Sequence, residues 1–329
     1  MKGKNSFTFK LGPEEQDRLT QALRTGNYRP LEVPYTRIAA EGPECNISLY
    51  QSGKLLVQGR GAEDWVRFVL EPQILGEARL DYEDVHQPEV FEPHMGVDES
   101  GKGDFFGPLV IAAVYTDRAL VEAFQSLNVR DSKMITSDRV ALTLDRELRD
   151  RLGQRFAVVA IGPRSYNRLY AGMGNVNRIL AWGHARAIEN LLEHVPHCPR
   201  AVSDQFGPKR QIEQALLKKG RTIRLEQRPR AESDPAVAAA SILARAAFLR
   251  ALAGLRDKYG IEIHKGASEQ VKKAAVAAVR KHQPAVLLEV AKCHFRTTDA
   301  VLAEAGAGRS ALGPDGQAVS KAAFSREKA

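Results

Sequence analysis

Four acidic side chains stand at positions where a sheet domain could gather them. Asp98 and Glu99 lie in GVDESGKGDFFGPLV at 96–110, Asp204 ends the apolar run RAVSD, and Glu232 comes just before a helical stretch, in RAESDPAVAAASILARAAF. Strand ends and helix starts bring side chains from distant sequence together. Carboxylates there can hold two divalent cations that activate a water and stabilise a leaving oxygen. Oxygen ligands favour Mg²⁺ or Mn²⁺ over Zn²⁺, so the pattern indicates metal-dependent phosphodiester chemistry.

The same stretch offers a competing interpretation as a nucleotide-binding loop. Gly96 to Lys102 has the spacing G-x-x-x-x-G-K, in which backbone N–H groups and the lysine surround a triphosphate. In such loops a Ser or Thr after the lysine binds magnesium, but Gly103 stands there. Asp98 and Glu99 would also repel phosphate unless metal ions stood between. The missing hydroxyl at Gly103 and the two carboxylates therefore argue against a nucleotide site.

Each acid also has an ordinary structural explanation. Adjacent acids such as Asp98 and Glu99 at the end of a strand are usually solvated, and Asp204 could be a turn residue. Asp234 directly precedes Pro235, which favours a helix N-cap with proline at the first helical position over metal binding. Taken singly, none of these residues establishes a function.

Residues 1–76 are expected to form a small α+β domain. SFTFKL alternates like a strand, and Gly12-Pro13 opens a helix that Gly26 suits as an end. ECNISLY and KLLVQGR flank a hairpin turn. A second helix, AEDWVRFVLEPQIL, is expected to place Trp65, Phe68 and Val69 on one face.

The remaining chain is expected to contain a linker, a larger domain and a tail. Residues 77–92 are acidic and aperiodic, as in a linker. In 93–304, apolar strands alternate with helical stretches, which predicts a mixed α/β domain with helices around a central sheet. Residues 305–329 are small, polar and basic, and a disordered tail is expected.

Charge and composition limit the class of protein. Net charge is +8, and residues 93–329 carry 37 Lys and Arg against 25 Asp and Glu, which suggests a polyanionic partner. No apolar run approaches the roughly 18 residues of a membrane span, and no secretory signal opens the chain. The three cysteines are single and scattered. A cytoplasmic protein without a membrane segment is expected, and a monomer is the default because no heptad pattern is present.

Several motifs carry a resemblance to a known family. GVDESGKGDFFGPLV resembles the signature of the type 2 ribonucleases H. Its lysine form, GKGDFFGPL, together with the upstream α+β domain, resembles ribonuclease HIII rather than ribonuclease HII, where GRG is usual. Further matches follow in order through the chain: Asp131-Ser132-Lys133, residues 165–192, SDQFG at 203–207, AESDPAVAAASILARAAFL, HKGAS at 264–268 and CHFRTT at 293–298.

The resemblance implies a fold and a set of site residues. The fold would be α/β: a ribonuclease H-like catalytic domain with a mixed central sheet flanked by helices, plus a small α+β N-terminal domain like the TATA-binding protein. The acidic quartet would be Asp98, Glu99, Asp204 and Glu232, with Mg²⁺ or Mn²⁺ held by the first three. In ribonuclease HII the fourth acid is an aspartate in an A-D-S setting. The A-E-S of this sequence favours Glu232, with Asp234 as a close competitor.

The glycine turn and nearby lysines would then contact substrate. Gly101 and Gly103, around Lys102, let the backbone approach the minor groove of an RNA–DNA hybrid and read the 2′-hydroxyl. Lys102 and Lys133 would contact phosphates, with His264 and Lys265 in support. The N-terminal domain would grip the hybrid through basic and tyrosine side chains, candidates being Lys10, Arg29, Arg37, Lys54, Arg60, Tyr28, Tyr35 and Tyr50.

Three functional hypotheses follow. The leading one is an endonuclease that cuts the RNA strand of RNA–DNA hybrids and leaves 5′-phosphate and 3′-hydroxyl ends. The second is a basic nucleic-acid-binding protein without turnover. The third is a ribonuclease HII-like enzyme that acts at single embedded ribonucleotides, which the N-terminal domain and the lysine form of the turn disfavour.

Overall fold

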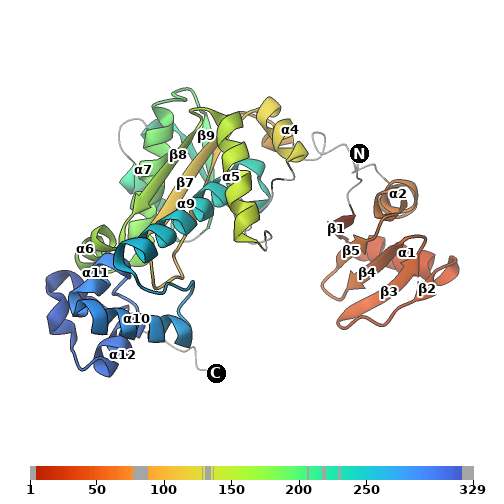
Figure 1. Ribbon diagram of the computed structural model, residues 1–329. Coiled ribbons are helices and arrows are strands. Elements are labelled where there is room, and N and C mark those ends of the chain that lie inside the picture. The colour runs from red at the N-terminus through yellow and green to blue at the C-terminus, as the bar shows by residue number, and fades with distance from the viewer. Residues whose placement is uncertain are drawn as a thin grey trace, which may run out of the picture. The chain divides into compact units, whose positions relative to one another are not determined.

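The chain consists of two compact units that divide between Glu89 and Val90 (Figure 1). The structure is a computed structural model, and it describes residues 5–76, 88–127, 129, 135, 137–205, 207–216, 220–228 and 231–320. Each unit has its own hydrophobic core.

The N-terminal unit is a five-stranded antiparallel sheet with helices on one face, in the strand order β1-β5-β4-β3-β2. Its elements are β1 Ser6–Lys10, α1 Pro13–Thr25, β2 Arg29–Pro30, β3 Thr36–Gly42, β4 Cys45–Tyr50, β5 Lys54–Gln58, α2 Ala62–Trp65 and the π-helix η1 Val66–Leu75. Leu19 and Leu23 of α1 pack on the inward-facing residues of the strands. The α+β domain expected from the sequence is confirmed.

The second helical stretch of this unit differs from the prediction in its period. A helix of 3.6 residues per turn would bury Phe68 beside Trp65, but Phe68 is 67% exposed. Because η1 is a π-helix with more residues per turn, the buried positions are instead Val66, Leu70 and Ile74. Phe68 consequently faces solvent.

The C-terminal unit is an α/β domain around a mixed five-stranded sheet. Its strands are β6 His94–Ser100, β7 Leu109–Thr116, β8 Phe156–Ile161, β9 Arg200–Asp204 and β10 Arg224–Arg228. Its α-helices are α4 Arg118–Ser126, α5 Asp138–Leu152, α6 Pro163–Met173, α7 Val176–Leu192, α8 Lys209–Ala215, α9 Pro235–Tyr259, α10 Glu269–His282, α11 Leu287–Val290 and α12 Thr297–Glu304. Short 3₁₀ turns complete it: η2 Pro88–Val90, η4 Gly220–Thr222, η5 Ala231–Ser233, η6 Pro284–Val286, η7 Arg309–Leu312 and η8 Pro314–Gly316.

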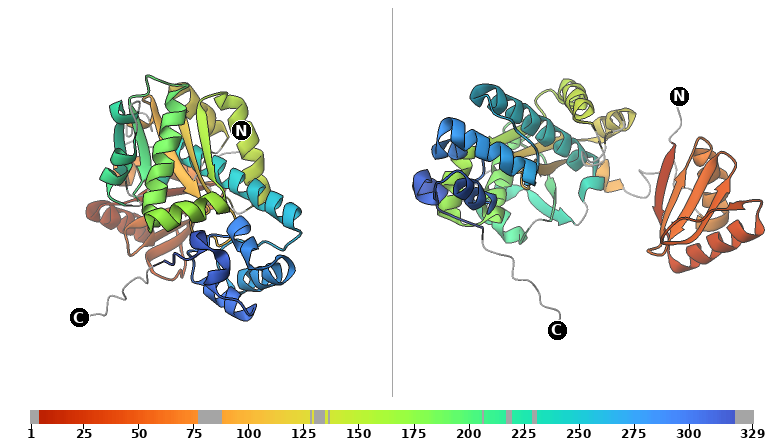
Figure 2. Two further views of the ribbon diagram at one scale, coloured as in Figure 1. Left: turned by 90° about the vertical axis from the view of Figure 1, so that its left-hand side faces the viewer. Right: turned by 60° about the horizontal axis from the view of Figure 1, so that its bottom comes forward.

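The strand order β10-β9-β6-β7-β8 makes β6 the centre of the sheet. β6 pairs antiparallel with β7 and parallel with β9, and β10 extends the parallel half. Helices α5 and α9 cover one face with one core cluster, and α7 covers the other with a second (Figures 1 and 2). Helices α10, α11 and α12 gather at one end of the unit, coloured blue in Figure 1. This is the mixed sheet flanked by helices that the sequence predicted.

Helix α9 is the central helix of the C-terminal unit. Among the described helices it alone is long and apolar enough to cross a membrane by length and composition, but 67% of its apolar window is buried inside the unit. Its first turn lies so close to β6 that a Cβ at Gly96 would stand 2.1 Å from the Val237 nitrogen. Gly96 is therefore a packing glycine within a strand, because only a residue without a side chain allows this approach.

Two predicted boundaries need correction. Of the predicted linker 77–92, residues 77–87 lie outside the described part of the chain, but Phe91 is buried under Arg118 and belongs to the C-terminal unit. Of the predicted disordered tail 305–329, residues 305–320 are part of the fold. Leu312 is buried, and Arg309 donates to the carbonyls of Cys293 and Gly316 at 2.9 and 2.6 Å. The buried Leu312 and the hydrogen bonds of Arg309 hold this segment of small and polar residues in the fold.

Candidate active site

Two of the predicted acids come together at the ends of neighbouring parallel strands. The paired stretch of β6 and β9 runs to Val97 opposite Ser203, so Asp98 and Asp204 are the next residues along each strand. In-register parallel neighbours point to the same face of a sheet. Here that face is the one covered by α9, because Gly96 and Val202 contact its first turn. Residues more than a hundred positions apart therefore share one edge of the sheet.

Glu99 points to the opposite face, where the buried His184 of α7 holds it. The His184 Nε2 atom lies 3.2 Å from Glu99 Oε2, and the Lys102 ammonium lies 3.6 Å from Oε1. Burial raises the pKa of the Glu99 carboxyl, but the hydrogen bond and charge of His184 and the charge of Lys102 outweigh it and leave the pKa below its usual value. Glu99 is therefore an ionised carboxylate at neutral pH.

Asp98, Glu99 and Asp204 all line one open pocket of about 540 Å³. Its other lining residues are Ser100, Gly101, Lys102, Asp104, Gln205, Arg245, Phe248, Leu249 and Lys265. Within the described residues, no three acidic, His or Cys side chains form a closed metal cluster. The donor set, carboxylate oxygens without thiolate, fits Mg²⁺ or Mn²⁺.

Cationic side chains stand beside the acids in the same pocket. Arg245 of α9 contacts Asp138 at 2.7 Å, and Lys265 contacts the same carboxylate at 2.7 Å. Burial raises the pKa of Asp138, but the hydrogen bonds and charges of Lys265 and Arg245 hold it below its usual value. Together with Lys102, Arg245 and Lys265 place positive charge beside the acids of the pocket.

The glycine turn between β6 and β7 forms one wall of the pocket. Gly101 has φ +90°, a conformation that favours glycine, and a Cβ there would lie 2.3 Å from the Pro108 carbonyl oxygen. The turn is fixed from the other side because Asp104 accepts a hydrogen bond from the Gly266 nitrogen at 2.6 Å. A strand, β7, follows the turn where a nucleotide-binding loop would continue into a helix, which excludes the P-loop interpretation.

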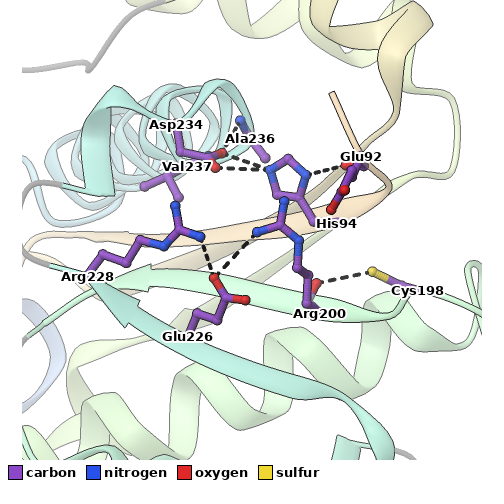
Figure 3. A network of polar contacts seen from close by, with 9 residues as sticks. All are labelled: Glu92, His94, Cys198, Arg200, Glu226, Arg228, Asp234, Ala236 and Val237. Carbon is purple, nitrogen blue, oxygen red and sulfur yellow. Dashed lines mark hydrogen bonds and ion pairs between the residues drawn. The ribbon is translucent and has the colours of Figure 1, made fainter. Parts of the chain in front are cut away.

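Asp234 is the N-cap of α9, with Pro235 at the first helical position. Its Oδ1 accepts hydrogen bonds from the Ala236 and Val237 nitrogens at 2.9 and 3.3 Å and lies 3.0 Å from the His94 Nε2 atom (Figure 3). His94 Nδ1 lies 2.7 Å from the Glu92 carbonyl oxygen. Both His94 and Asp234 are buried. The N-cap interpretation of Asp234 is confirmed, and its carboxylate is committed to the fold.

The other predicted site residues are less fully described. Glu232 lies in η5, immediately before α9, and its side chain is outside the described part of the structure, as is Lys133. Gly103 lies beside Lys102 in the turn, and nothing lies within 4 Å of the position its Cβ would take.

Sequence reasoning missed His184 and gave no role to Arg245. Each is a polar residue within the apolar face of a helix: His184 stands four residues from both Leu180 and Ile188, which are buried. A buried polar group at such a position usually has a specific partner. That pattern is the signal that could have identified them.

Figure 3 also shows a second polar cluster beneath the N-terminus of α9. Glu226 of β10 accepts hydrogen bonds from Arg200 at 3.4 Å and from Arg228 at 2.6 Å. Burial raises the pKa of Glu226, but Arg228, Arg200 and Arg224 outweigh it and lower the pKa. The contact between Arg200 and Glu226 ties the first residue of β9 to β10.

Comparisons with known proteins agree with this fold and site. Residues 95–298 match the family described as Ribonuclease HII, and residues 6–74 match a domain of unknown function, DUF3378. Ribonuclease HIII from Chlamydia trachomatis serovar L2 is 40% identical over 300 residues, covering 91% of this chain and 98% of that protein. Ribonuclease HIII from Protochlamydia amoebophila gives the same identity and coverage.

Solved structures give the same result. Bst-RNase HIII in complex with Mn²⁺ superposes with a TM-score of 0.62 at 28% identity, covering 91% of this chain and 99% of that one. A variant of the same protein gives a TM-score of 0.64 with the same identity and coverage. Both alignments include the N-terminal unit, since the catalytic unit alone is too short for that coverage.

The family match over residues 95–298 and these relatives place the chain in the ribonuclease H class of nucleases, as an endoribonuclease, and its mixed sheet agrees with that class. The chain belongs to the ribonuclease HIII family. The N-terminal unit, which the ribonuclease HII match does not include, is covered by these relatives.

Proposed function

We propose that the pocket at the ends of β6 and β9 hydrolyses the RNA strand of RNA–DNA hybrids and leaves 5′-phosphate and 3′-hydroxyl ends. The observation that carries this proposal is the placement of Asp98 and Asp204 at adjacent strand ends, with Glu99 lining the same pocket. Asp98, Glu99 and Asp204 would hold Mg²⁺ or Mn²⁺, and Glu232 would complete the site. Bound metal supplies a water of lowered pKa and stabilises the leaving oxygen.

The protein side chains have three further roles in this proposal. His184 holds the Glu99 carboxylate in one position through a contact of 3.2 Å. Lys102, Arg245 and Lys265 offer positive charge to backbone phosphates. The Gly101–Gly103 turn presents backbone groups that can read a 2′-hydroxyl. The commitment of Asp234 to His94 and to the start of α9 supports Glu232 as the fourth acid.

The first test is a cleavage assay on two duplexes of the same sequence. One is a continuous RNA–DNA hybrid and the other is DNA with a single embedded ribonucleotide, each with Mg²⁺, Mn²⁺ or EDTA. We expect metal-dependent cutting of the hybrid, little cutting at the single ribonucleotide, and no turnover in EDTA. Efficient cutting at the single ribonucleotide would favour the junction enzyme instead. If neither duplex were cut in the presence of metal, only the hypothesis of a nucleic-acid-binding protein without turnover would remain.

The N-terminal unit is proposed to grip the hybrid with the sheet face that its helices leave open. Lys10 of β1 and Lys54 of β5 are cross-strand partners on that face. Two of the other sequence candidates contact the helices instead: Arg37 pairs with Asp17 of α1 at 2.6 Å, and the Tyr28 hydroxyl accepts a hydrogen bond from Trp65 of α2. Lys10 and Lys54 therefore make the open face of the sheet the side that favours contact with the phosphates of the hybrid.

Replacing both Lys10 and Lys54 with alanine is expected to weaken hybrid binding and to reduce its salt dependence. Removing one lysine–phosphate interaction lowers the slope of log affinity against log salt by about one. The matched control is the double replacement of Arg18 and Arg24, exposed residues of α1 on the helical side, which removes the same charge. Fluorescence anisotropy across a salt series measures the affinity for the hybrid and its salt dependence for each variant. An equal change in the control would show a general charge effect and contradict the proposed face.

The protein is further proposed to act as a cytoplasmic monomer without a membrane partner. The buried α9 and the absence of a heptad pattern in the sequence support this. Light scattering at micromolar concentration tests the monomer, and a dimer would contradict it.

A further inference from the structure

Lys292 is fully buried, directly after α11, although lysine is among the residues least often buried. Its ammonium donates to three consecutive backbone carbonyls, those of Phe106 at 3.1 Å, Gly107 at 2.7 Å and Pro108 at 3.4 Å. An ammonium has three donors, so the three carbonyls match its full capacity. Burying an ammonium costs free energy of desolvation, which the three hydrogen bonds offset. A lysine at such a position therefore points to a specific structural role.

The carbonyls that Lys292 binds belong to the segment that follows the glycine turn. The backbone on both sides is joined as well: the Lys292 nitrogen donates to the Phe105 carbonyl, and the Gly107 nitrogen donates to the Val290 carbonyl, each at 2.8 Å. The Pro108 carbonyl is also the atom that a Cβ at Gly101 would meet at 2.3 Å. The position of this carbonyl therefore limits where the Gly101 backbone can lie.

We propose that Lys292 is a positioning residue for substrate recognition: by holding the carbonyls of residues 106–108, it fixes the Gly101–Gly103 turn against the hybrid and so supports the preference for RNA–DNA hybrid over DNA duplex. The inference rests on the proposed function. It gives the region of helices α10, α11 and α12 a part in substrate recognition, although that region contributes no acid to the pocket lining.

The protonation state of Lys292 should make the preference for the hybrid depend on pH. Burial lowers the pKa of Lys292 to about 7, although Asp104 acts in the opposite direction. Two other titratable groups face it: the Tyr166 ring, 5.9 Å from the ammonium, and His294. Burial raises the pKa of Tyr166, and burial, Lys292 and Arg309 lower that of His294 to about 4, so neither changes charge near neutral pH. A neutral amine has one donor fewer, so one carbonyl loses its partner above pH 7.

The test compares binding of a hybrid and of a DNA duplex of the same sequence, in EDTA so that no turnover occurs. Lys292→Met keeps the length and apolar stem but removes all three donors. We expect about tenfold weaker binding of the hybrid, the loss of roughly one charge-assisted hydrogen bond, with DNA affinity unchanged. The matched control is Lys281→Met, because Lys281 is an exposed lysine that also donates to a carbonyl, that of Gly260 at 2.7 Å. Circular dichroism establishes folding of both variants.

The pH dependence is the second measurement, and it needs no variant. In the wild type the ratio of hybrid to DNA affinity should fall from about pH 6 to about pH 8, as Lys292 loses its proton. In Lys292→Met the ratio should be low and flat over this range.

The outcomes separate this inference from the proposed function. A wild type that fails to cut hybrids contradicts the proposed function. If the wild type cuts hybrids but folded Lys292→Met keeps the wild-type ratio, or loses affinity for both duplexes equally, the positioning role is wrong. If Lys292→Met does not fold, the pH dependence of the wild type is the test. A wild-type ratio of hybrid to DNA affinity that stays constant from about pH 6 to about pH 8 then overturns the inference.

Discussion

Replacing Asp98 with asparagine is expected to lower hybrid cleavage more than about 100-fold, because even the outer partners of metal ligands contribute about 10- to 100-fold. The asparagine keeps the shape, and its carbonyl can still accept the hydrogen bond that Asp98 accepts from the Glu99 nitrogen at 2.8 Å. What it loses is the charge that would hold a divalent cation. Hybrid binding in EDTA should remain close to that of the wild type, since the basic groups of the pocket are untouched.

Cleavage rates and binding constants measured on the same preparation test this prediction. Asp257→Asn is the matched control, because Asp257 lies on α9 with an exposed side chain paired only at 3.5 Å with Arg256. It removes the same charge and should leave the cleavage rate unchanged. Full activity of Asp98→Asn would contradict the assignment of the site, and an equal loss of binding and cleavage would indicate a folding defect.

Replacing Asp234 with alanine is expected to destabilise the catalytic unit by about 2–4 kcal/mol, because a buried hydrogen-bond partner and a helix cap are lost together. His94, which is fully buried, would lose its partner at 3.0 Å, and α9 would lose its N-cap. The loss of a cap alone is worth about 1 kcal/mol. The effect should be large because α9 packs on both central strands, β6 and β7.

Urea unfolding followed by tryptophan fluorescence measures this effect. The chain has two tryptophans, one in each unit, so a Trp65→Phe background leaves Trp182 of α7 as the reporter of the catalytic unit. Asp257→Ala on the same helix is the control, and an exposed pair of this kind contributes at most about 1 kcal/mol. A change for Asp234→Ala no larger than for this control would show that the buried pair does not stabilise the start of α9.

The sequence predicted the features that depend on neighbouring residues. Gly12-Pro13 and Gly26 delimit α1, and Asp234-Pro235 opens α9, because caps and first-turn prolines act on the backbone beside them. Alternation and turn signals predicted the strands β1, β4 and β5 for the same reason. The local pattern failed for Phe68, since it assumed 3.6 residues per turn and η1 is wound as a π-helix. It also failed for residues 305–320, whose partners lie earlier in the chain.

The family and its chemistry could thus be recognised from the chain alone, because the motifs around Asp98, Asp204 and Glu232 are contiguous in sequence. Tertiary structure decided how those motifs meet. The parallel pairing of β6 with β9 brings Asp98 beside Asp204, α7 supplies His184 to Glu99, and Lys292 reaches the carbonyls behind the glycine turn. Such contacts join residues about 85 to 185 positions apart. No local pattern encodes them, since strand order and side-chain partners are selected by the burial of the whole core.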